Sequence, residues 1–597
     1  MTVLIFKIVL GFFPEDNYLF RDDGIITLSH AKNWIDFGFI GVNLSGEIVE
    51  GFSSPLQFLI YSFVYKIGGL HYSIFFTFQW WLTSFLFGFV LYLLFQEIFE
   101  SSKLENLAFS AGAIALLSVS FTFLAWHASG MENSWMHVLY LTYIFVLFKI
   151  LIGNPIHPVF ASLFLFAGML VRIESVFHLF FVSATFLYLS YKNRISWKQT
   201  IPIWVAGVLW SLFFLIRFLY FGRLFPNTST AQELSLSENM INLFRLSPSL
   251  GKNWEIFRFG FKQNLVLLIP VSFLLLFFKK IGTKEGIFVI LAVALSVSGF
   301  MHPFIFGNFR LDPARPMTWL AVIGVVLFLI RIVAITEKRK IWILPILLLA
   351  GFLSYKNYKF KSYNLCCSSQ IFEQRRSEVL QIVKSEQIQN ASLAIADLGV
   401  LSFYKEFNIL DLGYLGNQYL AKNKKNADKV FSYIRLNRPD VLEIHFPWSC
   451  EYSKLLNHPD FVKNYKLIFT TSEKAVLSSC LDGSKIVTGT FLYQGMAKDS
   501  PSIDRKIYSA FLKDPSLHAL TSQIDLCNAD QRNCFPLFRN LYRFVNRFKK
   551  NITDSEFVAA SNSFTKPEFK VYAATIWDRK SPSDDLVQSI VKHSIEE

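Results

Sequence analysis

Acidic and basic side chains gather near the start of an otherwise apolar chain. Arg21, Asp22 and Asp23 follow the apolar segment 3–13, and more carboxylates lie between them and the next long apolar run. A carboxylate beside a bilayer is costly unless it faces water, a partner or a reaction. Because an ionised carboxylate accepts a proton from a hydroxyl nucleophile, Asp22 and Asp23 are the candidate catalytic residues. Aspartate is also a favoured helix cap, so the pair is equally explained as the start of a helix near residue 24.

Further polar residues stand at the ends of apolar runs. Arginine presents a fixed fork of donors for phosphate oxygens and stays charged beside lipid. Carboxylates together with arginines at one membrane face match transfer from a lipid-linked phosphate donor to a hydroxyl. The candidate substrate-binding residues are Glu50, His127, Glu132, Arg172, Glu174, Asn227, Arg310 and Arg315.

These candidates also have structural explanations. Glu50 would order its loop, and His127 and Glu132 would be ordinary polar residues at a helix end. Arg172 and Glu174 would anchor a tight interfacial turn. Asn227 follows a proline, and both residues favour turns.

The composition indicates which class of protein carries these residues. Of 597 residues, 53% are hydrophobic and 17% are charged, whereas soluble domains carry about 25% charged residues. Runs such as 73–99 and 317–335 are long enough to cross a hydrocarbon core, which needs roughly 20 residues. The sequence therefore predicts a polytopic α-helical membrane protein.

The distribution of basic residues predicts the topology. Short basic gaps at 192–199, 279–284 and 337–340 are placed in the cytoplasm by the positive-inside rule. The net charge of +14 then reports topology, and no nucleic-acid partner is expected. The short apolar segment 55–68 is interpreted as an interfacial helix on the outer leaflet, since counting it as a span would invert every later loop. Eleven spans remain, at 2–13, 74–98, 106–126, 134–152, 157–171, 176–191, 200–220, 263–279, 285–305, 317–336 and 340–355.

The chain changes character after residue 355. Residues 1–355 are predicted to form the transmembrane domain, with a first outer loop at 14–73, and 356–597 an extracytoplasmic α/β domain. Segments 392–397, 408–412, 441–445 and 466–470 read as buried strands. All six cysteines lie in this second part, which fits disulfides in an oxidising compartment. They have no CxxC spacing, so no metal site is expected. No cofactor is expected for the chain either.

The first outer loop carries a recognisable pair of motifs. The stretch Asp22-Asp23-Gly-Ile-Ile-Thr-Leu-Ser-His-Ala-Lys-Asn33, followed by Val49-Glu50-Gly51-Phe52-Ser53-Ser-Pro55-Leu56, resembles the first outer loop of the GT-C glycosyltransferase superfamily. Within it, the chain is most similar to the bacterial group that contains the terminal arabinofuranosyltransferases. Further similar motifs are Ser129-Gly130-Met131-Glu132, Arg172-Ile173-Glu174, Phe225-Pro226-Asn227-Thr228, Arg315-Pro316, Ala396-Asp397-Leu-Gly399 and Asp411-Leu-Gly413-Tyr-Leu-Gly416.

The resemblance implies an inverting transferase that uses a polyprenyl-phosphate sugar. An aspartate of the first outer loop, here Asp22 or Asp23, would be the base, and basic residues would hold the phosphate. Two departures leave the sugar open: the arabinosyl relatives often have Arg-Pro-Glu where this chain has Arg172-Ile173-Glu174, and Asn308 stands where an acid is expected.

Two classes of function follow from these patterns. The first is a transferase in the cytoplasmic membrane that moves a sugar from a polyprenyl-phosphate donor to an envelope glycan, with its active site on the extracytoplasmic side. The second is a non-enzymatic transporter or sensor of lipid-linked sugars. A transporter should place ionisable residues near the middle of its spans, where this sequence has few.

Overall fold

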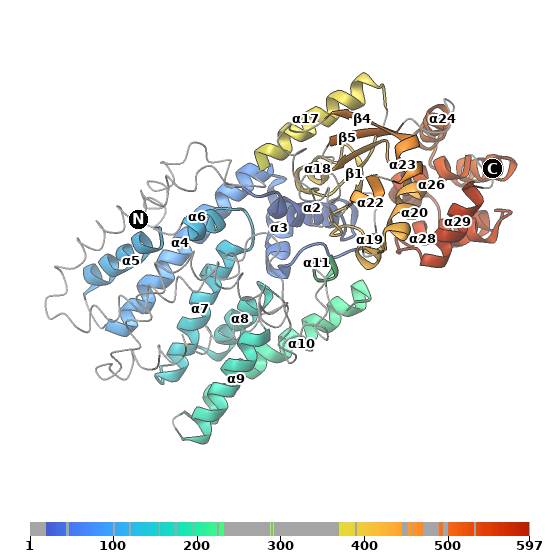
Figure 1. The fold of residues 1–597 in the computed structure, drawn as a ribbon. Coiled ribbons are helices and arrows are strands. Elements are labelled where there is room, and N and C mark those ends of the chain that lie inside the picture. Colours follow the sequence, from blue (N-terminus) through green and yellow to red (C-terminus); the bar gives the residue numbers. More distant parts are fainter. Residues whose placement is uncertain are drawn as a thin grey trace. The chain divides into compact units, whose positions relative to one another are not determined.

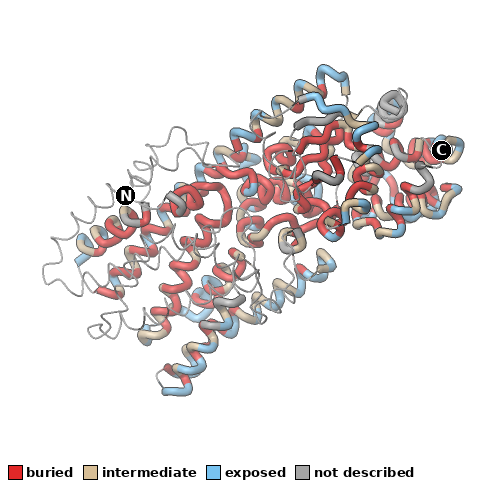
Figure 2. The backbone as a smooth tube through the Cα atoms, viewed as in Figure 1, coloured by how far each residue is buried: buried red, intermediate tan, exposed pale blue. Residues whose placement is uncertain are grey.

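The chain is mostly helical and divides into two compact units (Figure 1). Figure 2 shows buried segments in both of them. The computed structural model describes residues 20–231 and 369–595, with positions 287 and 291, apart from gaps at 43–46, 100–101, 119–120, 155, 173–175, 194, 224–225, 389–390, 425, 445–451, 457, 470–488, 494–499 and 531–532.

The first unit contains Met1–Gly24, Ser53–Leu224 and Gln232–Gln370. Its helices form one packed series: α5 and α7 both contact α4, α7 also contacts α8, and α8 contacts α10. The helices of this unit are α3 (Pro55–Gly68), α4 (Tyr72–Phe99), α5 (Lys103–Ser118), α6 (Phe121–His127), α7 (Asn133–Leu151), α8 (Pro158–Leu170), α9 (Val176–Tyr191), the 3-10 helix η3 (Trp197–Thr200) and α10 (Ile201–Phe221).

Most of these helices carry apolar side chains both on the face that packs in the core and on the face that is exposed. Phe87, Phe95 and Leu147 are fully buried between helices, whereas Leu212 and Ile216 of α10 are exposed. A helix that is apolar on its exposed face as well as its buried face is typical of one that meets lipid.

Three stretches of the described chain are long and apolar enough to cross a membrane: Tyr72–Phe99, Asn133–Leu151 and Trp197–Phe221. They coincide with the predicted spans 74–98, 134–152 and 200–220. The predicted spans 157–171 and 176–191 coincide with shorter helices, α8 and α9, and 106–126 contains α5 and α6. The remaining predicted spans, 2–13, 263–279, 285–305, 317–336 and 340–355, fall essentially outside the described residues.

The predicted helix at 55–68 is confirmed as α3. Its start is fixed by Pro55 at the first turn and by the Ser54 side chain, which accepts a hydrogen bond from the Gln57 amide. It ends at Gly69, whose φ of 55° is a left-handed conformation that glycine adopts at little cost. Phe63 and Ile67 on one face of α3 are exposed, whereas Phe58 and Tyr61 are buried.

The second unit contains a mixed five-stranded sheet of order β2-β1-β3-β5-β4. β1 pairs in parallel with β2 and β3, and β5 pairs antiparallel with β3 and β4. All four predicted strands are confirmed, and the fifth, β5, was not predicted. The strands are β1 (Ser392–Ile395), β2 (Asn408–Asp411), β3 (Val441–Ile444), β4 (Tyr465–Phe469) and β5 (Gly489–Tyr493).

Helices cover both faces of this sheet. Val379 and Val383 of α17 pack on one face against Leu393 and Val441. The other face continues into a larger core shared with the C-terminal helices, where Cys527 and Cys534 form a disulfide. The helices of this unit include α17 (Ser369–Ser385), α18 (Gly399–Tyr404), α19 (Gln418–Asn423), α20 (Ala427–Asn437), α22 (Ser453–Leu456), α23 (Pro459–Asn464), α24 (Ser500–Lys513), α25 (Leu517–Ala529), α26 (Cys534–Asn551), α27 (Asp554–Ser561), α28 (Pro567–Trp577) and α29 (Asp584–Ile595).

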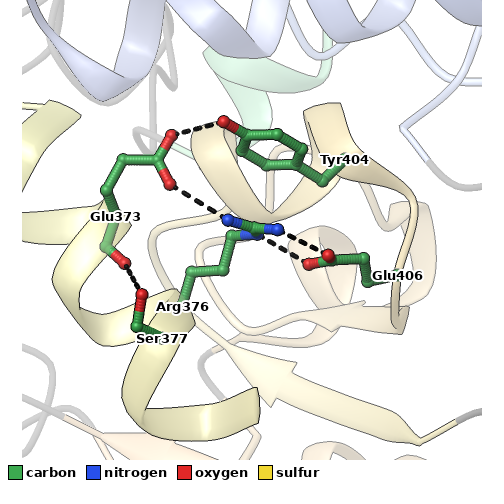
Figure 3. A network of polar contacts seen from close by, with 5 residues as sticks. All are labelled: Glu373, Arg376, Ser377, Tyr404 and Glu406. Carbon is green, nitrogen blue, oxygen red and sulfur yellow. Dashed lines mark hydrogen bonds and ion pairs between the residues drawn. The ribbon is translucent and has the colours of Figure 1, made fainter.

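A polar network fixes α17 to the loop between α18 and β2 (Figure 3). The guanidinium of Arg376 donates two hydrogen bonds to the Glu406 carboxylate, at 2.6 and 2.5 Å, and lies 3.7 Å from the centre of the Tyr404 ring. Glu373 accepts hydrogen bonds from both Arg376 and Tyr404. A bidentate arginine pair fixes orientation as well as distance, so this network has a structural role.

The second unit also includes two segments that are distant in sequence, Ile25–Phe52 and Phe225–Ala231. The first contains α2 (Asp22–Phe37) from its fourth residue, Ile25, onward, and the second contains the short helix α11 (Asn227–Ala231). The predicted outer loop 14–73 is therefore divided: its middle folds with the sheet, and its end, α3, folds with the helical unit.

Candidate functional site

The first turn of α2 lies directly on a tight turn formed by residues 129–132. The Arg21 amide donates to the Ser129 carbonyl at 2.9 Å, and the Arg21 guanidinium lies 5.1 Å from the centre of the Trp126 ring. Gly24 is in such close contact that an added Cβ would lie 2.5 Å from the Gly130 carbonyl oxygen. Two of the motifs found in the sequence, more than a hundred residues apart, therefore meet here.

The same turn presents the carboxylate of Glu132 to a cation. Glu132 Oε1 lies 3.5 Å from a guanidinium nitrogen of Arg172 and accepts a hydrogen bond from Ser53 Oγ at 3.3 Å. The Glu132 side chain is only 3% exposed, and that of Arg172 is 17% exposed. A buried carboxylate paired with a partly accessible arginine is well suited to orient the arginine toward an anionic ligand.

The two candidate bases differ in environment. α2 begins at Asp22, two residues earlier than expected, and both aspartates lie in its first turn. There the helix dipole favours negative charge. The Asp22 side chain is 3% exposed, whereas Asp23 is exposed to solvent. Both aspartates do lie at the start of a helix, as the structural explanation requires. They differ in exposure, because only Asp22 is buried.

His127 lies in a packed polar cluster between helices. Its Nε2 is 3.2 Å from Ser84 Oγ on α4, and its Nδ1 is 3.0 Å from Nδ1 of His137 on α7. The ring also stacks on Phe123. Because both ring nitrogens are engaged in contacts between helices, this geometry favours the structural explanation of His127.

Asn227 joins three loops of the second unit. Its Nδ2 donates to the carbonyls of Tyr414 and Leu415 at 2.6 and 2.9 Å, and its backbone amide donates to the Glu50 carbonyl at 2.9 Å. Asn227 and Glu50 are both buried. These contacts support the reading of Asn227 as the organiser of a turn and of Glu50 as an ordered loop residue.

His30 fixes the loop that carries Glu50. Its Nδ1–H donates to the Ile26 carbonyl at 2.8 Å, and its Nε2 accepts from the Gly51 amide at 3.2 Å. Gly51 is required at this position, because an added Cβ would lie 2.8 Å from the Leu415 carbonyl oxygen and 2.9 Å from the His30 ring. The Nδ1–H tautomer follows from these two partners.

Acidification is expected to destabilise this loop through His30. Burial lowers the pKa of His30 to about 4; its bond to Ile26 opposes this shift, and Lys405 adds to it. Since an unfolded histidine titrates near pH 6.5, the stabilisation is fully present above pH 6.5 and is lost as the pH falls toward 4. We expect the thermal midpoint to fall less over this range in His30→Gln than in the wild type. The exposed His518 on α25 supplies the matched control variant, His518→Gln.

Glu174, Arg310 and Arg315 lie outside the described residues. Arg217, another arginine near a helix end, donates to the Arg223 carbonyl at 3.3 Å and lies against Phe214. Within the described segments, no group of three histidine, cysteine, aspartate or glutamate side chains could hold a metal ion.

Three polar residues at the 129–132 turn were not predicted from the sequence. Gln57 and Tyr61 of α3 and Gln79 of α4 are all buried and donate to carbonyls of this turn. A signal was present, because Gln79 interrupts an apolar run, and polar residues at membrane depth are usually functional or paired.

Comparison with protein-family models, curated proteins and solved structures finds no match.

Proposed function

We propose that the chain is an inverting glycosyltransferase that moves a sugar from a polyprenyl-phosphate donor to a hydroxyl of a cell-envelope glycan. One observation carries this proposal: the first turn of α2, with Asp22, packs on the 129–132 turn, whose Glu132 is paired with Arg172. These are the residue types that the reaction needs, a base for the acceptor and a cation for the donor phosphate. The motif resemblance to the GT-C superfamily supports the same reaction.

The proposed chemistry assigns one role to each charged group. Asp22 takes the proton from the acceptor hydroxyl, and the acceptor oxygen attacks the anomeric carbon of the donor sugar from the face opposite the phosphate. The bond between the anomeric carbon and the phosphate oxygen breaks, so the configuration inverts and polyprenyl phosphate leaves. Arg172 stabilises the negative charge on the departing phosphate.

The proposed location is a multi-pass arrangement in the cytoplasmic membrane, with about eleven spans and the active site on its outer side. The three long apolar helices supply membrane-crossing segments. The disulfide between Cys527 and Cys534 supports an extracytoplasmic position for the sheet-containing unit, because structural disulfides persist in oxidising compartments.

Direct transfer by the purified full-length protein tests the proposal. The protein in lipid nanodiscs is incubated with a panel of polyprenyl-phosphate sugars and with envelope glycan from a strain that lacks the gene. We expect one donor to be consumed, with release of polyprenyl phosphate and a single new terminal sugar of inverted configuration on the glycan. Binding of the donor without release of polyprenyl phosphate would instead favour the transporter or sensor.

A further inference from the structure

We propose that Gln57, Tyr61 and Gln79 are positioning residues that hold the 129–132 turn, and with it Glu132 and Arg172, in place for the transfer reaction. This inference rests on the proposed glycosyltransferase function. It extends that function from the charged residues to three neutral side chains on two other helices, which the resemblance does not include.

Two of the three side chains converge on one carbonyl oxygen. Gly130 O accepts from Tyr61 Oη at 2.5 Å and from Gln57 Nε2 at 3.0 Å. Gln57 Nε2 also lies 2.6 Å from Tyr61 Oη, so the two side chains, one helical turn apart on α3, form a closed triangle with the carbonyl. Tyr61 is fully buried and Gln57 nearly so.

The third side chain approaches the next carbonyl from another helix. Gln79 Nε2, on α4, donates to Met131 O at 3.0 Å and to Ser134 Oγ at 2.9 Å. Since the Arg21 amide donates to Ser129 O, three consecutive carbonyls of the turn accept hydrogen bonds from three separate elements. The turn is thus tied to α3, α4 and the start of α2 at once.

The turn itself has little freedom to adapt. Gly130 has a φ of 74°, and an added Cβ would lie 2.3 Å from the Phe76 ring. Glu132, two residues later, carries the carboxylate that meets Arg172 and Ser53. A shift in the hydrogen bonds to the turn would therefore displace Glu132 and Arg172, and misplacing groups by 1 Å is enough to cost about 100-fold in rate.

The alternative is that these bonds serve only to pack the helices. Both helices offer matched controls, because each also carries a buried hydroxyl that bonds only within its own helix. Ser62 Oγ on α3 donates to the Phe58 carbonyl, and Thr83 Oγ1 on α4 donates to the Gln79 carbonyl. Ser62→Ala and Thr83→Val therefore remove a buried hydrogen bond without affecting the turn.

The test compares four full-length variants in nanodiscs: the double variant Gln57→Met/Tyr61→Phe, Gln79→Met, Ser62→Ala and Thr83→Val. The first two should lower kcat by about 10- to 100-fold with KM changed less than about threefold, as expected when catalytic geometry is lost and ground-state binding is kept. The two controls should keep kcat within about twofold of the wild type.

Hydrogen exchange gives a second measurement that does not depend on activity. The amides of Arg21 and Met131, which donate to Ser129 O and Ser129 Oγ, should exchange faster in the first two variants and at the wild-type rate in the controls. Faster exchange throughout the first unit would indicate a packing role and would overturn the inference.

The outcomes separate this inference from the function on which it rests. Unchanged kcat and unchanged Arg21 and Met131 exchange in the double variant and in Gln79→Met would overturn the inference and leave the transferase intact. A wild-type protein that transfers no sugar would overturn the transferase and the catalytic role of these residues. Hydrogen exchange of the Arg21 and Met131 amides would then still decide whether Gln57, Tyr61 and Gln79 hold the turn.

Discussion

Replacing Asp22 with asparagine should lower sugar transfer by at least about 100-fold, whereas Asp23→Asn should retain most of the activity. A positioned general base contributes about 100- to 10,000-fold, and asparagine cannot accept the proton. Of the two aspartates, Asp22 is the buried one, and it lies in the helical turn that packs on residues 129–132. A base held in place by buried surroundings needs less reorganisation to react than one exposed to solvent.

Asparagine is the suitable replacement because it preserves shape. It fits the first turn of α2 without a cavity, and it removes only the charge and the proton-accepting oxygen. Release of polyprenyl phosphate under saturating donor and acceptor gives kcat, and the loss should appear there rather than in KM. Asp36, an exposed aspartate further along α2 that pairs with Lys32 at 3.0 Å, supplies the control variant Asp36→Asn.

The assignment has two ways to fail. Loss of activity in Asp23→Asn together with an active Asp22→Asn would move the base to the exposed residue and would leave the transferase in place. Full activity in both variants, with transfer intact in the wild type, would exclude the pair as the base. The buried Glu132 would then be the carboxylate to replace next.

The elements that were predicted are those whose signals are local. Pro55 and Gly69 mark the two ends of α3 directly in the sequence, and short runs of aliphatic residues predicted β1 to β4. β5 was not predicted, because a sequence such as Gly489–Tyr493 shows no alternation of apolar and polar residues. Its strand conformation depends on pairing with β3 and β4.

The sequence supplied the candidate site residues but not how they group in the fold. The sequence placed all candidates on one outer face, yet Glu50 and Asn227 belong to the second unit and Glu132 and Arg172 to the first. This division depends on contacts between residues far apart in the chain, such as Asn227 with Tyr414. Neither the periodicity nor the spacing of residue types in the sequence can predict a hydrogen bond to a carbonyl 187 positions away.

The sheet-containing unit should fail to fold when it is expressed as residues 371–597 alone. Its core includes Ile26 and Val42 from the segment Ile25–Phe52, which pack with Leu393 and Ile409 of the sheet. Removing one large aliphatic side chain from a core costs about 2–5 kcal/mol, and a whole domain is stable by only about 5–15 kcal/mol. Loss of both residues would therefore remove much of the free energy of unfolding of this unit.

Polar contacts add to this dependence. Ser402 Oγ donates to Ser29 Oγ at 2.8 Å, and Lys405 Nζ donates to the Val42 carbonyl at 2.8 Å. The Arg579 guanidinium, from the end of α28, lies 3.8 Å from the centre of the Phe39 ring. The segment Ile25–Phe52 therefore contacts both the sheet region and the C-terminal helices, and it is an integral part of this unit.

Cooperative unfolding distinguishes a folded unit from a collapsed one. Residues 371–597 alone should show no sharp thermal transition by near-ultraviolet circular dichroism. The same residues joined to 25–52 and 225–231 through flexible glycine-serine linkers should regain one. The linked protein with Gly51→Ala is the control for specific docking, because its Cβ would meet the Leu415 carbonyl and should lower the midpoint. A sharp transition of residues 371–597 alone, at the midpoint of the linked protein, would mean that segments 25–52 and 225–231 add nothing to the stability of this unit.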